Sequence, residues 1–271
     1  MGINLEYAIQ NCVVEKSKFS DISANAISIG SADYYNRINW IYPDNYYYLP
    51  ADEKYYVKNN NICENTIENV AVEYRGAAAV SGGFLIDTDI AYNDISETAY
   101  SAIHINWGWN YINTSCTSNV RIHHNYIKNA LNSYMADGGA IYVLGPTSGK
   151  VRCSINNNYI DGVFSKTNYV YGSALYLDEG ASHWDVHSNV INLYETNSTY
   201  FTNKNWISSL EENKKENHIY NNFISNYSRH HCDTEVGNYV KNTTICTDLN
   251  WTDEALEIIS GAGTKGKEGQ N

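Results

Sequence analysis

A recurring asparagine constrains the fold of this chain more than any other feature. It returns every 28–33 residues, with a β-branched residue three positions before it and an isoleucine two positions after it. The apolar alternation keeps a period of two on each side but changes parity across the asparagine, which predicts a turn joining two short strands. The six asparagines are Asn65, Asn93, Asn125, Asn158, Asn189 and Asn222.

A further apolar segment follows in most repeats, at residues 26–30, 102–106, 140–144 and 174–178. Stacked repeats of this kind predict an all-β fold, a right-handed parallel β-helix built as a single-stranded solenoid with protruding loops. A helical solenoid is excluded because the segments are short, β-branched and of period two. Asparagines stacked in register are expected to bond to one another as a ladder.

The repeat pattern also suggests where the chain divides. Residues 1–250 are expected to form the parallel β-helix domain, with residues 31–58 as an inserted aromatic loop. Residues 251–271 predict a short helix, N-capped by Thr252, followed by a flexible tail. Nothing before the first coil resembles a cap for its open edge, so we expect a fragment of a longer protein.

Composition excludes several classes of function. The net charge of −12 disfavours nucleic acid as a partner. The chain has no apolar run of the roughly 18 residues that a membrane span needs. Its six cysteines form no C-x-x-C pair, so no metal site is expected, and no organic cofactor is implied. The 25 tyrosines against 5 phenylalanines suit a surface that handles sugars. We therefore expect a monomer with a carbohydrate substrate.

The strongest candidates for chemistry lie on the third segment of consecutive repeats. If its isoleucines and leucines face inward, His104, Tyr142 and Tyr176 face outward in one column. Asp137 enters this strip ahead of two glycines, and Asp178 lies where the strip ends, with Glu179 beside it as a reserve candidate. Two carboxylates across a groove are what glycoside hydrolysis requires. An Asp at a turn can also simply cap backbone N–H groups, which is the competing interpretation.

Two tryptophans and one arginine complete the candidate site. Trp107 and Trp109 flank a glycine at the end of an outward-facing strand and are expected to stack on sugar rings. Arg75 is a further candidate for substrate binding and the one attractive base for a lyase mechanism. The overall acidity of the chain disfavours that mechanism.

Four segments together resemble secreted bacterial β-helix enzymes that act on carbohydrates, most closely glycoside hydrolase family 141. They are Val72-Glu-Tyr-Arg-Gly76, Trp107-Gly-Trp109, Asp137-Gly-Gly-Ala-Ile-Tyr142 and Leu175-Tyr-Leu-Asp-Glu-Gly180. The resemblance covers roughly residues 5–228. It implies α-L-fucosidase or xylanase activity, an extracellular or cell-surface location, and a catalytic pair on Asp137 and Asp178.

Two other functions stay open on the sequence. A polysaccharide lyase is the other common chemistry of such folds, and a non-catalytic or degenerate carbohydrate-binding protein would keep the aromatic face without needing either aspartate. Fold alone does not choose among them.

Overall fold

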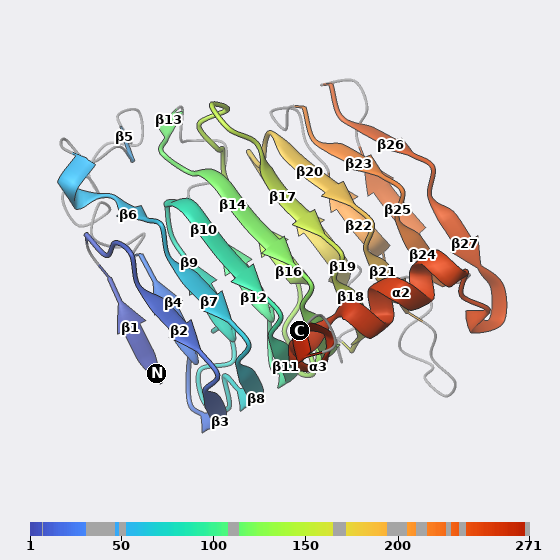
Figure 1. Ribbon diagram of the computed structural model, residues 1–271, viewed down its shortest axis with the longest axis horizontal. Coiled ribbons are helices and arrows are strands. Elements are labelled where there is room, and N and C mark those ends of the chain that lie inside the picture. Colours follow the sequence, from blue (N-terminus) through green and yellow to red (C-terminus); the bar gives the residue numbers. More distant parts are fainter. Residues whose placement is uncertain are drawn as a thin grey trace.

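A computed structural model of the 271-residue chain describes residues 1–6, 8–30, 47–48, 53–107, 114–164, 172–193, 205–209, 216–225, 229–232 and 237–268. Its strands form three long parallel sheets. Figure 1 shows the strands advancing along the longest axis, from β1 near the N-terminus to β27. One pass of the chain, meaning one repeat of about 30 residues, therefore lies beside the next.

Each pass contributes one strand to each sheet. Sheet A contains β1 (Ile3–Leu5), β4 (Ile27–Ile29), β9 (Val80–Gly82), β12 (Ile103–Ile105), β16 (Gly138–Val143), β19 (Gly172–Leu177), β22 (Asn205–Ser209) and β25 (Arg229–Cys232). Sheet B contains β2 (Val13–Glu15), β7 (Asn61–Cys63), β10 (Leu85–Ala91), β14 (Ser118–His123), β17 (Cys153–Asn156), β20 (Trp184–His187), β23 (His218–Tyr220) and β26 (Tyr239–Lys241), with β6 (Val57–Lys58) also paired to β10. Sheet C contains β3 (Lys18–Ile22), β8 (Thr66–Val70), β11 (Asp94–Thr98), β15 (Tyr126–Ala130), β18 (Tyr159–Val163), β21 (Val190–Asn192), β24 (Phe223–Ser225) and β27 (Thr244–Cys246).

This topology corrects the predicted fold class. The prediction of a single-stranded right-handed parallel β-helix was wrong, because the strands are distributed over three parallel sheets of eight, nine and eight strands. The repeat pattern located the segments and their inward faces. It carried no information on how the turns between segments divide them among separate sheets.

Inward-facing β-branched residues explain why these segments are strands. The residues three positions before each repeated asparagine pair directly in sheet B, as in Ile90 with Ile122 and Ile122 with Ile155. Those two positions after it pair in sheet C, as in Ile95 with Ile127. All of these side chains are at most 3% exposed and belong to one core that draws on all three sheets. Burying each isoleucine contributes about 1.5–3 kcal/mol before the cost of ordering the chain.

The predicted asparagine ladder is present between sheets B and C. Each side-chain amide donates to the carbonyl oxygen of the next asparagine, for example Asn93 to Asn125 at 2.9 Å and Asn125 to Asn158 at 3.0 Å. All six asparagines are fully buried. The left-handed residue of each turn is the one before the asparagine, such as Tyr92 (φ 55°) and His124 (φ 53°). The asparagines are therefore selected for their amide bonds, while their neighbours bear the backbone strain.

The last passes of the chain end in two helices, α2 (Asp253–Gly261) and α3 (Gly263–Glu268). Thr252 caps α2 by accepting a hydrogen bond from the backbone N–H of Ala255. The segment expected to be a flexible tail is thus helical as far as Glu268. α3 returns to the middle of the molecule, where Thr264 donates to Asp94 of β11 at 2.5 Å (Figure 1). No helix in the described part of the chain is long and apolar enough to cross a membrane.

Most of the aromatic insertion expected at residues 31–58 lies outside the described residues. Of the remainder, β5 (Tyr47–Tyr48) pairs in parallel with β13 (Thr114–Ser115), and the 3-10 helix η2 (Glu53–Tyr55) precedes β6. A second 3-10 helix, η4 (Thr247–Leu249), links the last strand to α2.

Candidate active site

The site is built on the outer face of sheet A, where three aromatic side chains stand in register. His104 of β12 pairs with Tyr142 of β16, which pairs with Tyr176 of β19. The predicted outward column is therefore confirmed. The His104 and Tyr142 rings lie 4.9 Å apart at 63°, and the Tyr142 and Tyr176 rings lie 5.2 Å apart at 88°. Both tyrosines are only 6% exposed, so their rings pack edge to face instead of forming an open platform.

The hydrogen bonds of the two tyrosines are crossed: Tyr142 of β16 binds Asp178, which follows β19, and Tyr176 of β19 binds Asp137, which precedes β16. The Tyr142 hydroxyl donates to Oδ2 of Asp178 at 2.5 Å, and the Tyr176 hydroxyl donates to Oδ1 of Asp137 at 3.0 Å. Asp178 is 7% exposed, whereas Asp137 is exposed. The crossed contacts tie β16 to β19 and direct two carboxyl groups to one aromatic cluster.

Asp137 lies in the turn that leads into β16. The backbone at Asp137 has φ 59°, which turns the chain there. Its carbonyl oxygen accepts a 2.5 Å hydrogen bond from the Tyr100 hydroxyl. Tyr100 thus fixes the turn from outside the predicted set of site residues.

The two glycines after Asp137 have a packing role. A Cβ on Gly138 would lie 2.5 Å from the Tyr100 ring, and one on Gly139 would lie 2.9 Å from Cβ of Tyr176. In the structure these glycines admit the two tyrosines that position Asp137.

Both carboxylates act electrostatically on the same tyrosines. Burial raises the pKa of Tyr142, and the charge and hydrogen bond of Asp178 raise it further, with Asp137 contributing less. Burial likewise raises the pKa of Tyr100, followed by the charges of Asp137 and Asp178. The hydroxyls consequently stay protonated and remain hydrogen-bond donors at neutral pH. Burial lowers the pKa of His104 to about 4, so this ring is neutral.

The other predicted site residues fall at different distances from this cluster. Trp107 packs against it beside Tyr142 and Tyr176, while Trp109 lies outside the described residues. Glu179 is half-buried, and its carbonyl oxygen accepts a hydrogen bond from Gly145. Arg75 is exposed on the turn before β9, and no contact among the described residues joins it to either aspartate.

A pocket of about 470 Å³ continues the site along sheet A, towards β1. His104 and Trp107 form its boundary with the aromatic cluster, and its far end reaches Asn4. Asn106, which follows β12, also lines it and is 3% exposed. The sequence alone gave no reason to include Asn106 in the site.

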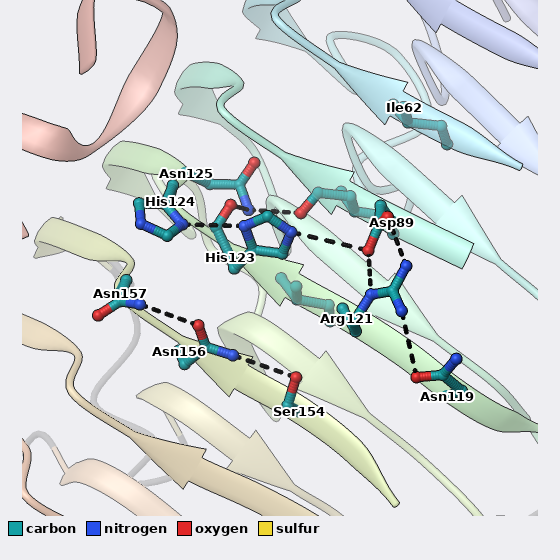
Figure 2. A network of polar contacts seen from close by, with 12 residues as sticks. Ile62, Asp89, Asn119, Arg121, His123, His124, Asn125, Ser154, Asn156 and Asn157 are labelled. Atoms are coloured by element: carbon teal, nitrogen blue, oxygen red, sulfur yellow. Dashed lines mark hydrogen bonds and ion pairs between the residues drawn. The ribbon is translucent and has the colours of Figure 1, made fainter. Parts of the chain in front are cut away.

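A second polar cluster, shown in Figure 2, lies on sheet B. Arg121 donates to both carboxylate oxygens of Asp89, at 2.5 and 2.6 Å, and His123 approaches the same carboxylate at 3.6 Å. Nδ1 of His123 lies 2.9 Å from Nδ1 of His124, whose ring stacks on Tyr92. Burial alone would raise the pKa of Asp89, but the His123 and Arg121 contacts hold it well below its ordinary value.

This second cluster supports the fold. The carbonyl oxygen of His124 accepts a 2.7 Å hydrogen bond from the backbone N–H of Gly263, where α2 meets α3. The cluster therefore joins β10 and β14 to the returning helices. Its polar atoms are engaged with one another (Figure 2).

Among the described residues, one group of side chains has the spacing of metal ligands. The ligand atoms of Glu15, Cys63 and Glu64 lie within 4.8 Å of one another, far along the sheets from the aspartate pair. Lys16 already lies 3.9 Å from Glu64. This group has no link to the carboxylate chemistry.

Comparisons with known proteins give one informative match. A solved structure described as a glycoside hydrolase superposes with a TM-score of 0.60 at 19% sequence identity. The match covers 98% of this chain and 37% of that chain, so this chain spans little more than a third of that protein's length. No protein-family model matches the chain. No curated protein matches it either. At this identity the likeness establishes a glycoside-hydrolase-like fold.

Proposed function

We propose that the chain is a glycoside hydrolase that cleaves fucosidic or xylosidic linkages in plant or host polysaccharide, as its resemblance to glycoside hydrolase family 141 implies. The observation that carries the proposal is the crossed pair of tyrosine–aspartate contacts on β16 and β19. They orient two carboxyl groups towards one aromatic cluster at the edge of a pocket. The fold shared with a solved glycoside hydrolase supports the same class.

The two aspartates differ in ways that suit different roles. Asp178 is buried and accepts a short hydrogen bond from Tyr142, which stabilises the negative charge that a nucleophile or general base carries. Asp137 is exposed, so the leaving oxygen of a substrate can approach it from solvent, and we assign it the role of proton donor. In this mechanism the acid protonates the glycosidic oxygen while Asp178 attacks the anomeric carbon or activates a water molecule.

The lyase alternative finds no support among the described residues of this site. A lyase needs a cationic or basic group beside the acidic sugar, and Arg75 is not joined to either aspartate. Burial keeps His104 neutral, so it supplies no positive charge. Lyase products would also absorb in the ultraviolet through their new double bond, which separates the two reactions in one assay.

The test is turnover of a nitrophenyl glycoside panel that includes the fucoside and the xyloside. Asp137→Asn and Asp178→Asn are each expected to reduce kcat by about 10²-fold or more. Asp161→Asn is a matched control, because Asp161 also accepts a tyrosine hydroxyl, from Tyr126 at 3.3 Å, but on sheet C. A parent chain that cleaves none of the panel, or equal losses in all three variants, would contradict the proposal.

An extracellular or cell-surface location belongs to the same proposal, since it too derives from the family resemblance. Polysaccharides of plant or host origin lie outside the bacterial cell. Activity in the culture medium of the producing cells, measured on the same panel, is the corresponding expectation.

A further inference from the structure

The pocket beside the aspartate pair contains two buried polar atoms without a partner. Nδ2 of Asn106 and Nε2 of His104 make no hydrogen bond within the described part of the chain. The Asn106 carbonyl oxygen, in contrast, is fully engaged with the backbone N–H of Phe84 and the hydroxyl of Thr117. Those two donors fix the amide orientation, so its NH₂ group is the end that remains unsatisfied.

An unsatisfied buried donor is costly. Leaving such a group unsatisfied destabilises a folded protein, and most buried polar groups in proteins find a partner. Two of them beside one pocket indicate a partner that comes from outside the chain. Both atoms are shielded from water, so a ligand that binds them has to displace part of the pocket wall.

The remaining lining identifies the chemistry of that ligand. Small polar side chains, Ser28 and Ser81 among them, occupy the register positions that continue the His104 column along sheet A. Glu6 is the one charged side chain among the described lining residues; Met1, with the N-terminal amino group, also lines the pocket. Trp107 adds an aromatic edge. This lining suits an uncharged ligand rich in hydroxyl groups and gives a uronate no cationic side chain as a counter-charge.

The position of the pocket relates it to the aspartates. Strands of sheet A are about 4.8 Å apart, so the pocket extends from His104 to Asn4 over roughly 14 Å. It begins one strand away from Tyr142, on the side of β16 opposite to β19. A volume of about 470 Å³ lies in the usual range of about 300–1,000 Å³ for small-molecule sites.

We infer that this pocket is a glycosyl subsite, in which Asn106 and His104 bind the hydroxyl groups of a neutral sugar unit adjoining the one that reacts. The inference rests on the proposed function for the identity of the reacting unit. The substrate then lies across the strands of sheet A and occupies at least two sites. Neutral chains are accepted and uronate chains are discriminated against.

The test measures binding, so that it does not depend on turnover. Titration calorimetry uses the Asp137→Asn background with two neutral trisaccharides, xylotriose and 2′-fucosyllactose, and with trigalacturonate. Ser81→Phe fills the pocket from β9 without touching the aspartate pair. Ser154→Phe is the matched control, a half-buried outward serine on β17 of sheet B.

Ser81→Phe is expected to weaken the binding of a neutral trisaccharide about tenfold, and Ser154→Phe by less than about twofold. Trigalacturonate is expected to bind at least about tenfold more weakly than the neutral ligand. The inference is overturned if no neutral trisaccharide binds, if Ser81→Phe leaves the affinity unchanged, or if trigalacturonate binds equally well. Failure of the hydrolase proposal is a different result, since it appears as inactivity of the parent on the glycoside panel.

Discussion

The crossed tyrosine–aspartate contacts predict a measurable coupling energy. Tyr142→Phe removes one hydroxyl and keeps the ring that packs between His104 and Tyr176. The lost hydrogen bond is 2.5 Å long, and its two side chains are 6% and 7% exposed. A hydrogen bond to a charged group contributes about 1.5–3 kcal/mol, and little solvent screening reduces it here. We expect a coupling of about 2 kcal/mol between Tyr142 and Asp178.

The second contact supplies an internal comparison. The bond from Tyr176 to Asp137 is 3.0 Å long, and Asp137 is exposed to solvent. Water can replace the tyrosine hydroxyl at that carboxylate. The coupling between Tyr176 and Asp137 should therefore stay below about 1 kcal/mol.

The assay is a double-mutant cycle for each pair, measured by urea unfolding. The variants are Tyr142→Phe, Asp178→Asn and their combination, with Tyr176→Phe, Asp137→Asn and their combination as the second cycle. A coupling below about 0.5 kcal/mol for the buried pair, or equal couplings for the two pairs, would refute the reasoning from burial and bond length.

Two further predictions concern buried polar groups elsewhere in the fold. Asn125→Ala should lower the free energy of unfolding by about 3–5 kcal/mol, because it deprives the carbonyl oxygen of Ile90 and the amide of Asn93 of their partners. The control Asn156→Ala removes a half-buried surface amide and should lower that free energy by less than about 1 kcal/mol. Similar losses for the two variants in urea unfolding would contradict the importance of the ladder. His104 has a folded pKa of about 4 against an ordinary value of 6.5, so the unfolded chain binds more protons between those pH values and stability should rise with pH across that window, then level off. His104→Gln should remove up to about 1.4 kcal/mol of that rise per pH unit, and an unchanged slope between pH 4 and 6.5 would show that burial does not keep this ring neutral.

The sequence predicted the side-chain columns because a period-two pattern reports which residues face inward. Ile90, Ile122 and Ile155 each stand three residues before a repeated asparagine, and the structure pairs them in register as that spacing predicts. The number of sheets depends instead on the direction of each turn. Left-handed residues such as Tyr92 and His124 lie at these turns; they share the position before the asparagine but no common residue type that would reveal the direction of the turn. The fold class was therefore wrong while the register was right.

The candidate site, like the fold, was predictable only in part. The column of His104, Tyr142 and Tyr176 follows from alternation alone. Tyr100 contacts Asp137 across 37 residues of sequence, and no local signal indicates this. The near-complete burial of the two strip tyrosines also depends on packing that alternation does not encode. Whether Asp137 and Asp178 are catalytic stays a prediction.

The geometry of the site follows from where the aspartates lie on their strands. Asp137 precedes β16 and Asp178 follows β19, so in two straight strands the carboxyl groups would stand at opposite ends of the pair. The turn at Asp137 and the two crossed tyrosines bring both groups to the same cluster. β16 and β19 pair from Gly138 with Gly172 to Val143 with Leu177, so the relative position of the two strands that carry the aspartates at their ends is fixed. Glycoside hydrolysis depends on the separation between its two carboxyl groups, so under the proposed function the paired strands would set that separation before any substrate binds.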